Sequence, residues 1–239
     1  MAKERRKTIR AGSLWMAVQY STIRGDNQTA RREARSTISS PAREALNAKT
    51  SWQKLMMVLA TNFRRKDLLV TLSYRDENLP PTRENADRLL TNFIRRLRAE
   101  RKRLGQDLRY VRVTEGYHSD GRLHHHLIVN DTGEDFDLIR NLWAKNGDNV
   151  DFTPFGWDGA ERWAKYLTKE PREKGRRYVG DRSWRASRNL MRPQPSYEFV
   201  PAEAALLPPP GAEIIDRTEC ENSYGRFSYM VAILPEEDS

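Results

Sequence analysis

The alternation of hydrophobic and polar residues predicts strands and amphipathic helices through the middle of the chain. Short apolar runs at residues 67–74, 110–114 and 127–129 have the length of buried strands. Longer segments, with apolar residues three and four positions apart, predict helices. The expected helices cover residues 42–63, 82–104, 136–145 and 157–168, and further strands are expected over residues 150–155, 211–218 and 224–234.

The order of these elements favours an α+β fold. Two central strands are joined by the loop-like residues 116–122, and a loop this short pairs them antiparallel. We therefore expect a central antiparallel sheet flanked by helices, with extensions at both ends. The expected domains are a basic N-terminal arm and helix (1–66), a central domain (67–195) and an acidic C-terminal extension (196–239). The last two strands form either an appended hairpin or the outer edge of the sheet.

The charge of the chain is uneven and favours a polyanionic partner. The net charge is +9, and residues 201–239 hold eight acidic and two basic residues, so the first 200 residues carry +15. Such a surplus, mostly arginine, is typical of nucleic-acid binding, although solubility alone is the alternative explanation. The residues expected to contact DNA are Arg95, Arg98, Arg101, Lys102, Lys165 and Arg172.

The cysteine content and hydropathy exclude several classes. Cys220 is the one cysteine, which excludes an internal disulfide and a cysteine-based metal site. No apolar run approaches the ~20 residues that cross a bilayer. The charged N-terminus lacks the apolar core of a signal peptide, so we expect a cytoplasmic protein without a membrane partner.

Three successive histidines are the strongest chemical signal. On a strand, His124 and His126 share one face, roughly 6.6 Å apart along the strand, and two imidazoles at that spacing can hold one metal ion. A hairpin brings Glu115, which ends the preceding strand, back beside this pair. His125 points the other way and is expected to pack or to support the ligands. A purely structural histidine cluster is the alternative.

A tyrosine and a lysine in the helix over residues 157–168 and just after it form a second chemical element. Tyr166 and Lys169 are three positions apart and share a helix face. A phenol of pKa about 10 is a poor nucleophile near neutral pH, but a nearby ammonium favours the phenolate and a metal ion activates a phosphodiester target. The pair therefore suits attack on phosphorus only in combination with the metal site. Tyr178 is a weaker candidate nucleophile.

These motifs, in this order, resemble those of rolling-circle replication initiators of the HUH endonuclease superfamily, of the single-tyrosine phage or plasmid type. Residues 69–74 resemble the first strand motif, residues 115–126 the metal motif and residues 166–169 the nucleophile motif. Residues 187–190 also resemble phage and small-plasmid members. The chain departs from the pattern at His125, where the superfamily has a hydrophobic residue.

The resemblance implies an HUH endonuclease fold with an RRM-like palm, and metal-dependent nicking and joining of DNA. It implies that Glu115, His124 and His126 hold a divalent ion, and that Tyr166 forms a 5′-phosphotyrosine bond while Lys169 steadies the phosphate or the tyrosine. Mg²⁺ is the implied physiological ion, and the imidazole ligands make Mn²⁺ at least as effective.

The implied partners are single-stranded DNA or an origin hairpin, together with a host DNA polymerase in the bacterial cytoplasm. A host helicase is also expected, because the chain has no G-x-x-x-x-G-K-[ST] motif for ATP. Two other functions stay open. A basic DNA- or RNA-binding protein with structural histidines would bind in EDTA, and an iron oxygenase with two histidines and one carboxylate would need Fe(II) and O₂.

Overall fold

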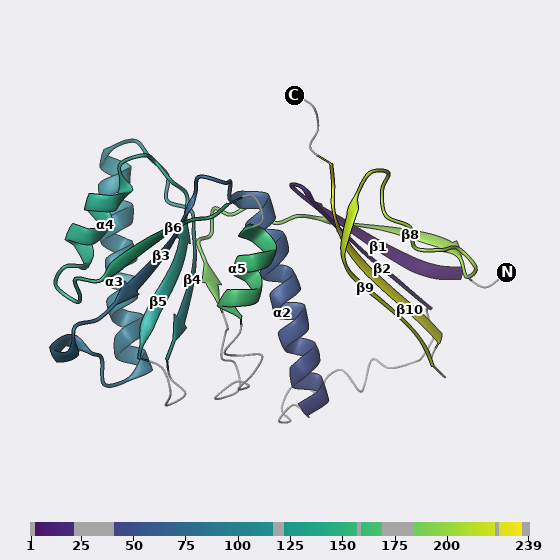
Figure 1. Cartoon of the computed structure of the whole chain (residues 1–239), viewed down its shortest axis with the longest axis horizontal. Coiled ribbons are helices and arrows are strands. Elements are labelled where there is room, and N and C mark those ends of the chain that lie inside the picture. The colour runs from purple at the N-terminus through teal and green to yellow at the C-terminus, as the bar shows by residue number, and fades with distance from the viewer. Residues whose placement is uncertain are drawn as a thin grey trace. The chain divides into compact units, whose positions relative to one another are not determined.

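The computed structural model describes residues 3–21, 41–116, 122–156, 159–168, 184–222 and 225–235, with the backbone alone for residues 41–49, 222 and 225. The chain divides into a central unit, Ser40–Met191, and a terminal unit, which combines Met1–Ser39 with Arg192–Ser239. The described residues hold four α-helices, all in the central unit, and two five-stranded antiparallel sheets, one in each unit (Figure 1). The expected α+β class is confirmed.

The central unit is built on a sheet in which every neighbouring pair of strands is antiparallel, in the order β6-β3-β5-β4-β7. Its strands are β3 (Leu68–Ser73), β4 (Tyr110–Glu115), β5 (His124–Val129), β6 (Val150–Pro154) and β7 (Arg185–Ala186). The first four match strands expected from the sequence. In the β4–β5 hairpin, Glu115 lies opposite His124 and Val113 lies opposite His126.

The helices agree with the predicted ones to within a few residues. They are α2 (Pro41–Asn62), α3 (Arg83–Arg103), α4 (Asp135–Trp143) and α5 (Gly159–Leu167), with a 3₁₀ turn η1 (Asp76–Asn78) before α3. Thr82 caps α3, because its hydroxyl accepts a hydrogen bond from the backbone N–H of Asn85 at 3.2 Å. No helix among the described residues is long and apolar enough to cross a membrane.

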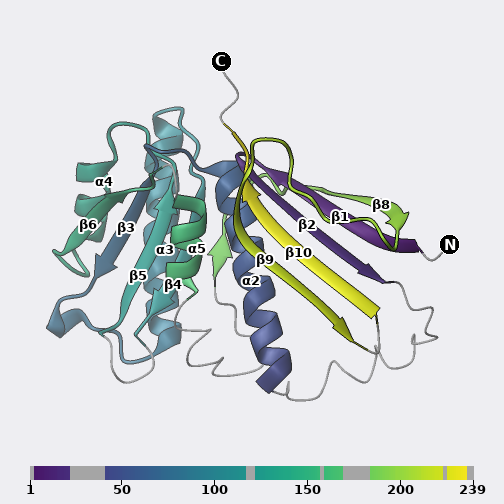
Figure 2. The ribbon, with the colours of Figure 1, turned by 45° about the vertical axis from the view of Figure 1, so that its right-hand side comes forward.

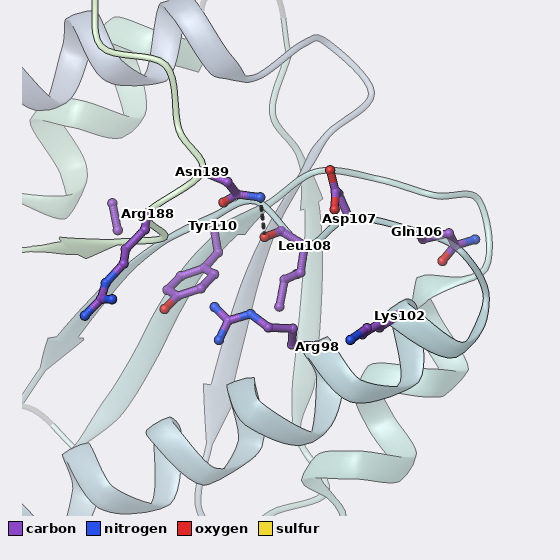
Figure 3. Close-up of a pocket in the computed structure, with 9 residues that line it drawn as sticks. Arg98, Lys102, Gln106, Asp107, Leu108, Tyr110, Arg188 and Asn189 are labelled. Carbon is purple, nitrogen blue, oxygen red and sulfur yellow. Dashed lines mark hydrogen bonds between the residues drawn. The ribbon is translucent and has the colours of Figure 1, made fainter.

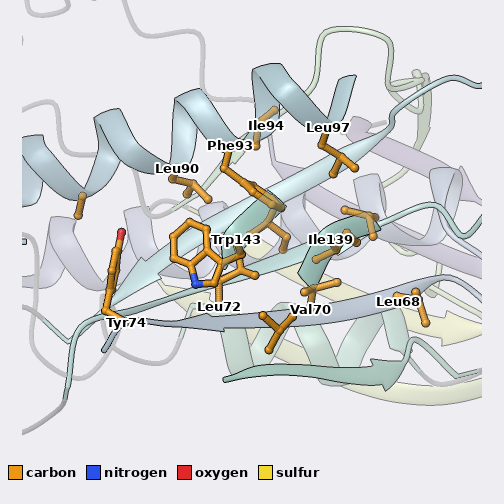
Figure 4. Close-up of a cluster of buried hydrophobic side chains, with 14 of the residues drawn as sticks. Leu68, Val70, Leu72, Tyr74, Leu90, Phe93, Ile94, Leu97, Ile139 and Trp143 are labelled. Carbon is orange, nitrogen blue, oxygen red and sulfur yellow. The ribbon is translucent and has the colours of Figure 1, made fainter. Parts of the chain in front are cut away.

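The main core lies between one face of the central sheet and the helices α3 and α4. Val70 and Leu72 alternate along β3 and point to this face, where they pack with Phe93 of α3 and Trp143 of α4 (Figure 4). Trp143 is fully buried and its indole N–H donates to the carbonyl of Ser73 at 2.8 Å. Each such buried side chain stabilises the fold by about 1.5–3 kcal/mol, so this face holds the sheet in place.

The opposite face of the sheet carries α5, and α2 packs against α5 (Figure 2). The indole N–H of Trp163 donates to the carbonyl of Phe155 at 2.9 Å, which ties α5 to the end of β6. The ring of Phe155 also lies 6.0 Å from that of Phe63, at the end of α2. These contacts hold α5 over the strand that carries the histidines.

The terminal unit is a second sheet, in the order β8-β1-β2-β10-β9. Its strands are β1 (Lys3–Ala11), β2 (Leu14–Ser21), β8 (Pro195–Pro201), β9 (Glu213–Asn222) and β10 (Gly225–Ile233). The late hairpin is therefore part of a sheet, but not of the central one. Gly12 and Ser13 close the tight β1–β2 turn, where Gly12 has a positive φ of 57° that favours glycine.

The N-terminal segment differs from the basic arm expected from the sequence, because β1 and β2 are strands of the terminal sheet and α2 belongs to the central unit. The buried positions of these strands are partly polar, which hides the alternation on which strand prediction depends. Glu4 and Gln19 are both buried, and the amide of Gln19 donates to the carboxylate of Glu4 at 2.7 Å. Ser21 donates to the same carboxylate at 3.1 Å.

Candidate metal centre and tyrosine

The β4–β5 hairpin brings one carboxylate and two imidazoles together on the face of the sheet below α5. Oε2 of Glu115 lies 3.6 Å from Nε2 of His124 and 3.5 Å from Nε2 of His126, and the two Nε2 atoms are 3.0 Å apart. These residues could hold a metal ion. The sequence-based grouping of the three residues therefore agrees with their positions in the structure.

Hydrogen bonds at the far side of each imidazole aim its Nε2 atom into the cluster. Nδ1 of His124 donates to the carbonyl of Arg122 at 2.7 Å, which leaves the Nε2 lone pair of the neutral ring free. Nδ1 of His126 lies 3.1 Å from the hydroxyl of Thr71 on β3. With Thr71 as the acceptor, both Nε2 lone pairs face each other at 3.0 Å. Such partners orient histidine ligands around metal ions in proteins.

The donor set fits a divalent cation. Two lone pairs and a carboxylate repel one another at these distances, and a cation among them removes the repulsion. Adjacent ligands of an octahedral ion bound at about 2.1 Å lie ~3.0 Å apart, close to the observed separations. Oε1 of Glu115 is buried and has no hydrogen-bond partner among the described residues. The side chain of His124 is 26% exposed, so the cluster is open to a ligand from solvent.

Tyr166 projects from α5 beside this cluster. Its ring centroid lies 5.1 Å from that of His126, and the side chain is 43% exposed. Burial raises the pKa of the Tyr166 phenol above its usual range, and the negative charge of Glu115 raises it further. The protein charges around the phenol thus favour its protonated form, and a cation beside Glu115 would offset the second effect.

The structure places the other predicted site residues in different settings. Lys169, Arg172 and the alternative nucleophile Tyr178 lie outside the described residues. Lys165 is exposed and forms an ion pair with Glu161, one helical turn earlier. Arg95, Arg98 and Lys102 lie on α3 with solvent access, where DNA can reach them.

Arg101 is a correction, because it is buried and cannot contact DNA. Its side chain and that of Asp135 are both fully buried, with Nη2 of Arg101 at 2.6 Å from Oδ1 of Asp135. Its Nη1 donates to the amide oxygen of Asn130 at 2.9 Å and to the carbonyl of Asp107 at 3.2 Å. A buried guanidinium needs such partners, and here they fasten α3 to α4 and to the loop after β5.

His125 points away from the cluster into the core. Its Nε2 lies 2.6 Å from the hydroxyl of Tyr74 and its Nδ1 lies 2.9 Å from the hydroxyl of Thr114. Burial lowers the pKa of His125 to about 3, with smaller effects from the charges of Arg112 and the neighbouring histidines. A neutral, hydrogen-bonded imidazole therefore fills the position where the HUH pattern has a hydrophobic side chain.

The sequence-based interpretation missed the residues that orient the ligands. Thr71 lies opposite His126 in the β3–β5 pairing, and the Arg122 carbonyl lies two residues before His124. The signal for Thr71 was its place in the predicted strand, since it alternates with Val70 and Leu72 and so faces away from the core. Using that signal required the strand register, which the sequence pattern did not supply.

Comparison with known proteins agrees with this geometry. Residues 67–171 match the family model of the replication-associated protein ORF2, and this range contains the three ligands and Tyr166. The resemblance to phage-type rolling-circle replication initiators is thereby confirmed over this segment. Neither a curated protein nor a solved structure shows significant similarity to the chain.

Proposed function

We propose that the central unit is a metal-dependent endonuclease that nicks and rejoins single-stranded DNA to start rolling-circle replication. The observation that carries the proposal is the position of Tyr166, whose ring lies 5.1 Å from that of His126, at the edge of a three-ligand cluster. The match to replication-associated proteins over the same residues supports a DNA substrate.

The cluster suits Mg²⁺ or Mn²⁺, held by Glu115, His124 and His126. A divalent ion bound there would polarise the scissile phosphate and neutralise part of its charge. The three residues occupy one side of the cluster, and the exposed side chain of His124 marks the side open to phosphate oxygens. Arg122 and Thr71 keep the imidazoles in the ligating orientation through their hydrogen bonds to Nδ1.

Tyr166 supplies the nucleophile in this proposal. Its Oη attacks the phosphorus, an Oη–P bond forms, and the bond from phosphorus to the 3′ oxygen breaks. The phenol loses its proton, and the leaving 3′ oxygen gains one, so a free 3′ hydroxyl is released while the 5′ phosphate stays on the tyrosine. Because the phosphodiester is exchanged for a phosphotyrosine ester, the strand can be rejoined without another energy source. We expect Lys169 to steady the phosphate.

The substrate would be a single strand or an unpaired region of an origin hairpin. The exposed position of Tyr166 lets an unpaired strand reach the cluster from solvent. The released 3′ hydroxyl would prime a host DNA polymerase, and a host helicase would unwind the template.

The test is formation of a covalent protein–DNA adduct. The protein is incubated with Mn²⁺ and a pool of single-stranded DNA of varied sequence, then separated on a denaturing gel. We expect an adduct that disappears with EDTA and in Tyr166→Phe but persists in the matched variant Tyr178→Phe, with mass spectrometry placing the DNA on Tyr166. An adduct lost only in Tyr178→Phe would reassign the nucleophile.

Two outcomes would favour the other functions. DNA binding in EDTA, with no adduct for any sequence in the pool, would identify a non-enzymatic DNA-binding protein. An activity that requires Fe(II) and O₂ would identify an oxygenase built on the same three ligands.

A further inference from the structure

A basic pocket lies on the face of the central sheet opposite the metal cluster. It has a volume of about 650 Å³ and is lined by α3, the start of β4 and the segment after β7 (Figure 3). Tyr110, in its lining, is five positions before Glu115 on β4, and residues an odd number of positions apart on a strand point to opposite faces. The pocket is therefore separate from the nicking site.

The charged side chains of this pocket favour an anion. Arg98 and Lys102 reach it from α3, and Arg188 reaches it from the segment after β7. None of the three forms an ion pair with any residue that the structure describes. Asp107 is the one carboxylate in the lining, and the Asp107 backbone carbonyl accepts hydrogen bonds from Arg101 and Asn130. The lining thus keeps a positive charge for a ligand to neutralise.

An aromatic ring lies among these cations. Figure 3 shows Tyr110 between Arg188 and Arg98, and the guanidinium carbon of Arg98 is 5.8 Å from the ring centroid. The backbone of Tyr110 is fixed by Ser187, whose hydroxyl accepts from the Tyr110 N–H at 3.1 Å and whose N–H donates to the Tyr110 carbonyl at 2.9 Å. A fixed ring flanked by cations can stack on a base while the cations bind the adjoining phosphates.

Arg112 extends the positive lining along the same face of β4. It is two residues from Tyr110, is 8% exposed and borders a small recess beside Arg185. Its Nη1 is buried and has no hydrogen-bond partner among the described residues. Asp87 is near but is already paired with Arg185 at 3.5 Å. A buried donor without a partner is costly, and a phosphate oxygen of a bound strand would supply the missing acceptor.

We propose that this pocket is a second DNA site, which holds an unpaired nucleotide of a single strand with its base on Tyr110 and its phosphates against Arg98, Lys102 and Arg188. The volume suits one nucleotide. A duplex is disfavoured, because its bases are stacked on each other and cannot reach the recessed ring. The site adds to the proposed nicking function a contact away from the cleaved phosphate, but its existence does not depend on that function.

The test measures binding of labelled oligo(dT) of about 20 nucleotides by fluorescence anisotropy in EDTA, where the nicking site holds no metal. This length exceeds the sites of typical single-strand binders. We expect Arg98→Gln/Lys102→Gln to weaken binding about tenfold and to lower the slope of log affinity against log salt by about 1.4, since two phosphate contacts are lost. The matched control is Arg95→Gln/Arg103→Gln, which removes the same charge from exposed positions of α3 outside the pocket.

The role of the ring is tested by Tyr110→Leu, which keeps the net charge. We expect at least about fivefold weaker binding, the lower end of what one stacked base contributes. Equal binding by the pocket and control double variants would overturn the proposal, as would unchanged binding in Tyr110→Leu with a folded protein by circular dichroism. Stronger competition by duplex, or by free dTMP at the same nucleotide concentration, would overturn it too.

The same experiment separates this proposal from the proposed nicking function. Tyr166→Phe should bind oligo(dT) in EDTA as the unaltered protein does, whether or not an adduct forms in the gel assay. Loss of the adduct in every assay with intact pocket-dependent binding would leave the second site standing and remove the endonuclease.

Discussion

The two faces of the central sheet treat the same kind of side chain in opposite ways. Toward α5, His124 and His126 direct Nε2 atoms to one point 3.0 Å apart beside a carboxylate. Toward α3 and α4, His125 is buried with a hydroxyl at each nitrogen and is held neutral. The comparison teaches that the partners of an imidazole, and not its place in a motif, decide whether it can bind a metal ion.

Removing a ligand on the open face should have the largest effect. We expect His124→Ala to reduce adduct formation by about a thousandfold or more, because the metal then loses one of three protein ligands. His124 is partly exposed, so the melting temperature should change little. His126→Ala should give the same loss of adduct, and Mn²⁺ titration by calorimetry should show weaker binding in both. Normal Mn²⁺ affinity in either variant would contradict the assigned ligands.

Removing a buried charge on the closed face should unfold the protein instead of inactivating the site. Arg101→Leu leaves Asp135 charged and unpaired in the core, and we expect a loss of about 3–5 kcal/mol in the free energy of unfolding. Urea denaturation measures this change. Arg98→Leu, on the same helix but with solvent access, is the control and should stay within ~0.5 kcal/mol of the unaltered protein.

His125 should make stability depend on pH. Its folded pKa of about 3 lies below the ordinary value of 6.5, so the unfolded chain binds the proton more tightly and stability falls as pH drops below 6.5. By pH 4.5 we expect a loss of about 2.7 kcal/mol from this residue. His125→Leu should remove that part of the pH dependence, which urea titrations at several pH values would show. Parallel pH profiles for the two proteins would contradict a neutral buried imidazole.

The smallest expected effect tests the support of a ligand. Thr71→Val removes the hydroxyl beside Nδ1 of His126 and should weaken Mn²⁺ binding by about 10–100-fold, with Thr71→Ser restoring it. Calorimetry measures the affinity without reference to activity. An unchanged affinity in Thr71→Val would show that packing alone orients the imidazole of His126.

Local patterns were enough for most of the central unit. Alternation along β3 and the helical spacing of α3 reflect burial against one core, so each predicted its own element. The histidine spacing likewise grouped the three ligands, since a hairpin between adjacent strands leaves little freedom in pairing. The same patterns failed for β1 and β2, where Glu4 and Gln19 take buried positions through a hydrogen bond that no hydrophobic pattern reveals.

The sequence by itself determined the α+β class, the hairpin with its metal ligands and the helix that carries the tyrosine, because these depend on contacts between residues close in the chain. Tertiary structure alone decided that Tyr166 lies beside His126, that Arg101 is a buried structural ion, and that the two ends of the chain share one sheet. Those outcomes depend on pairings between segments far apart in sequence, and residue type or spacing does not specify which distant partner a side chain meets.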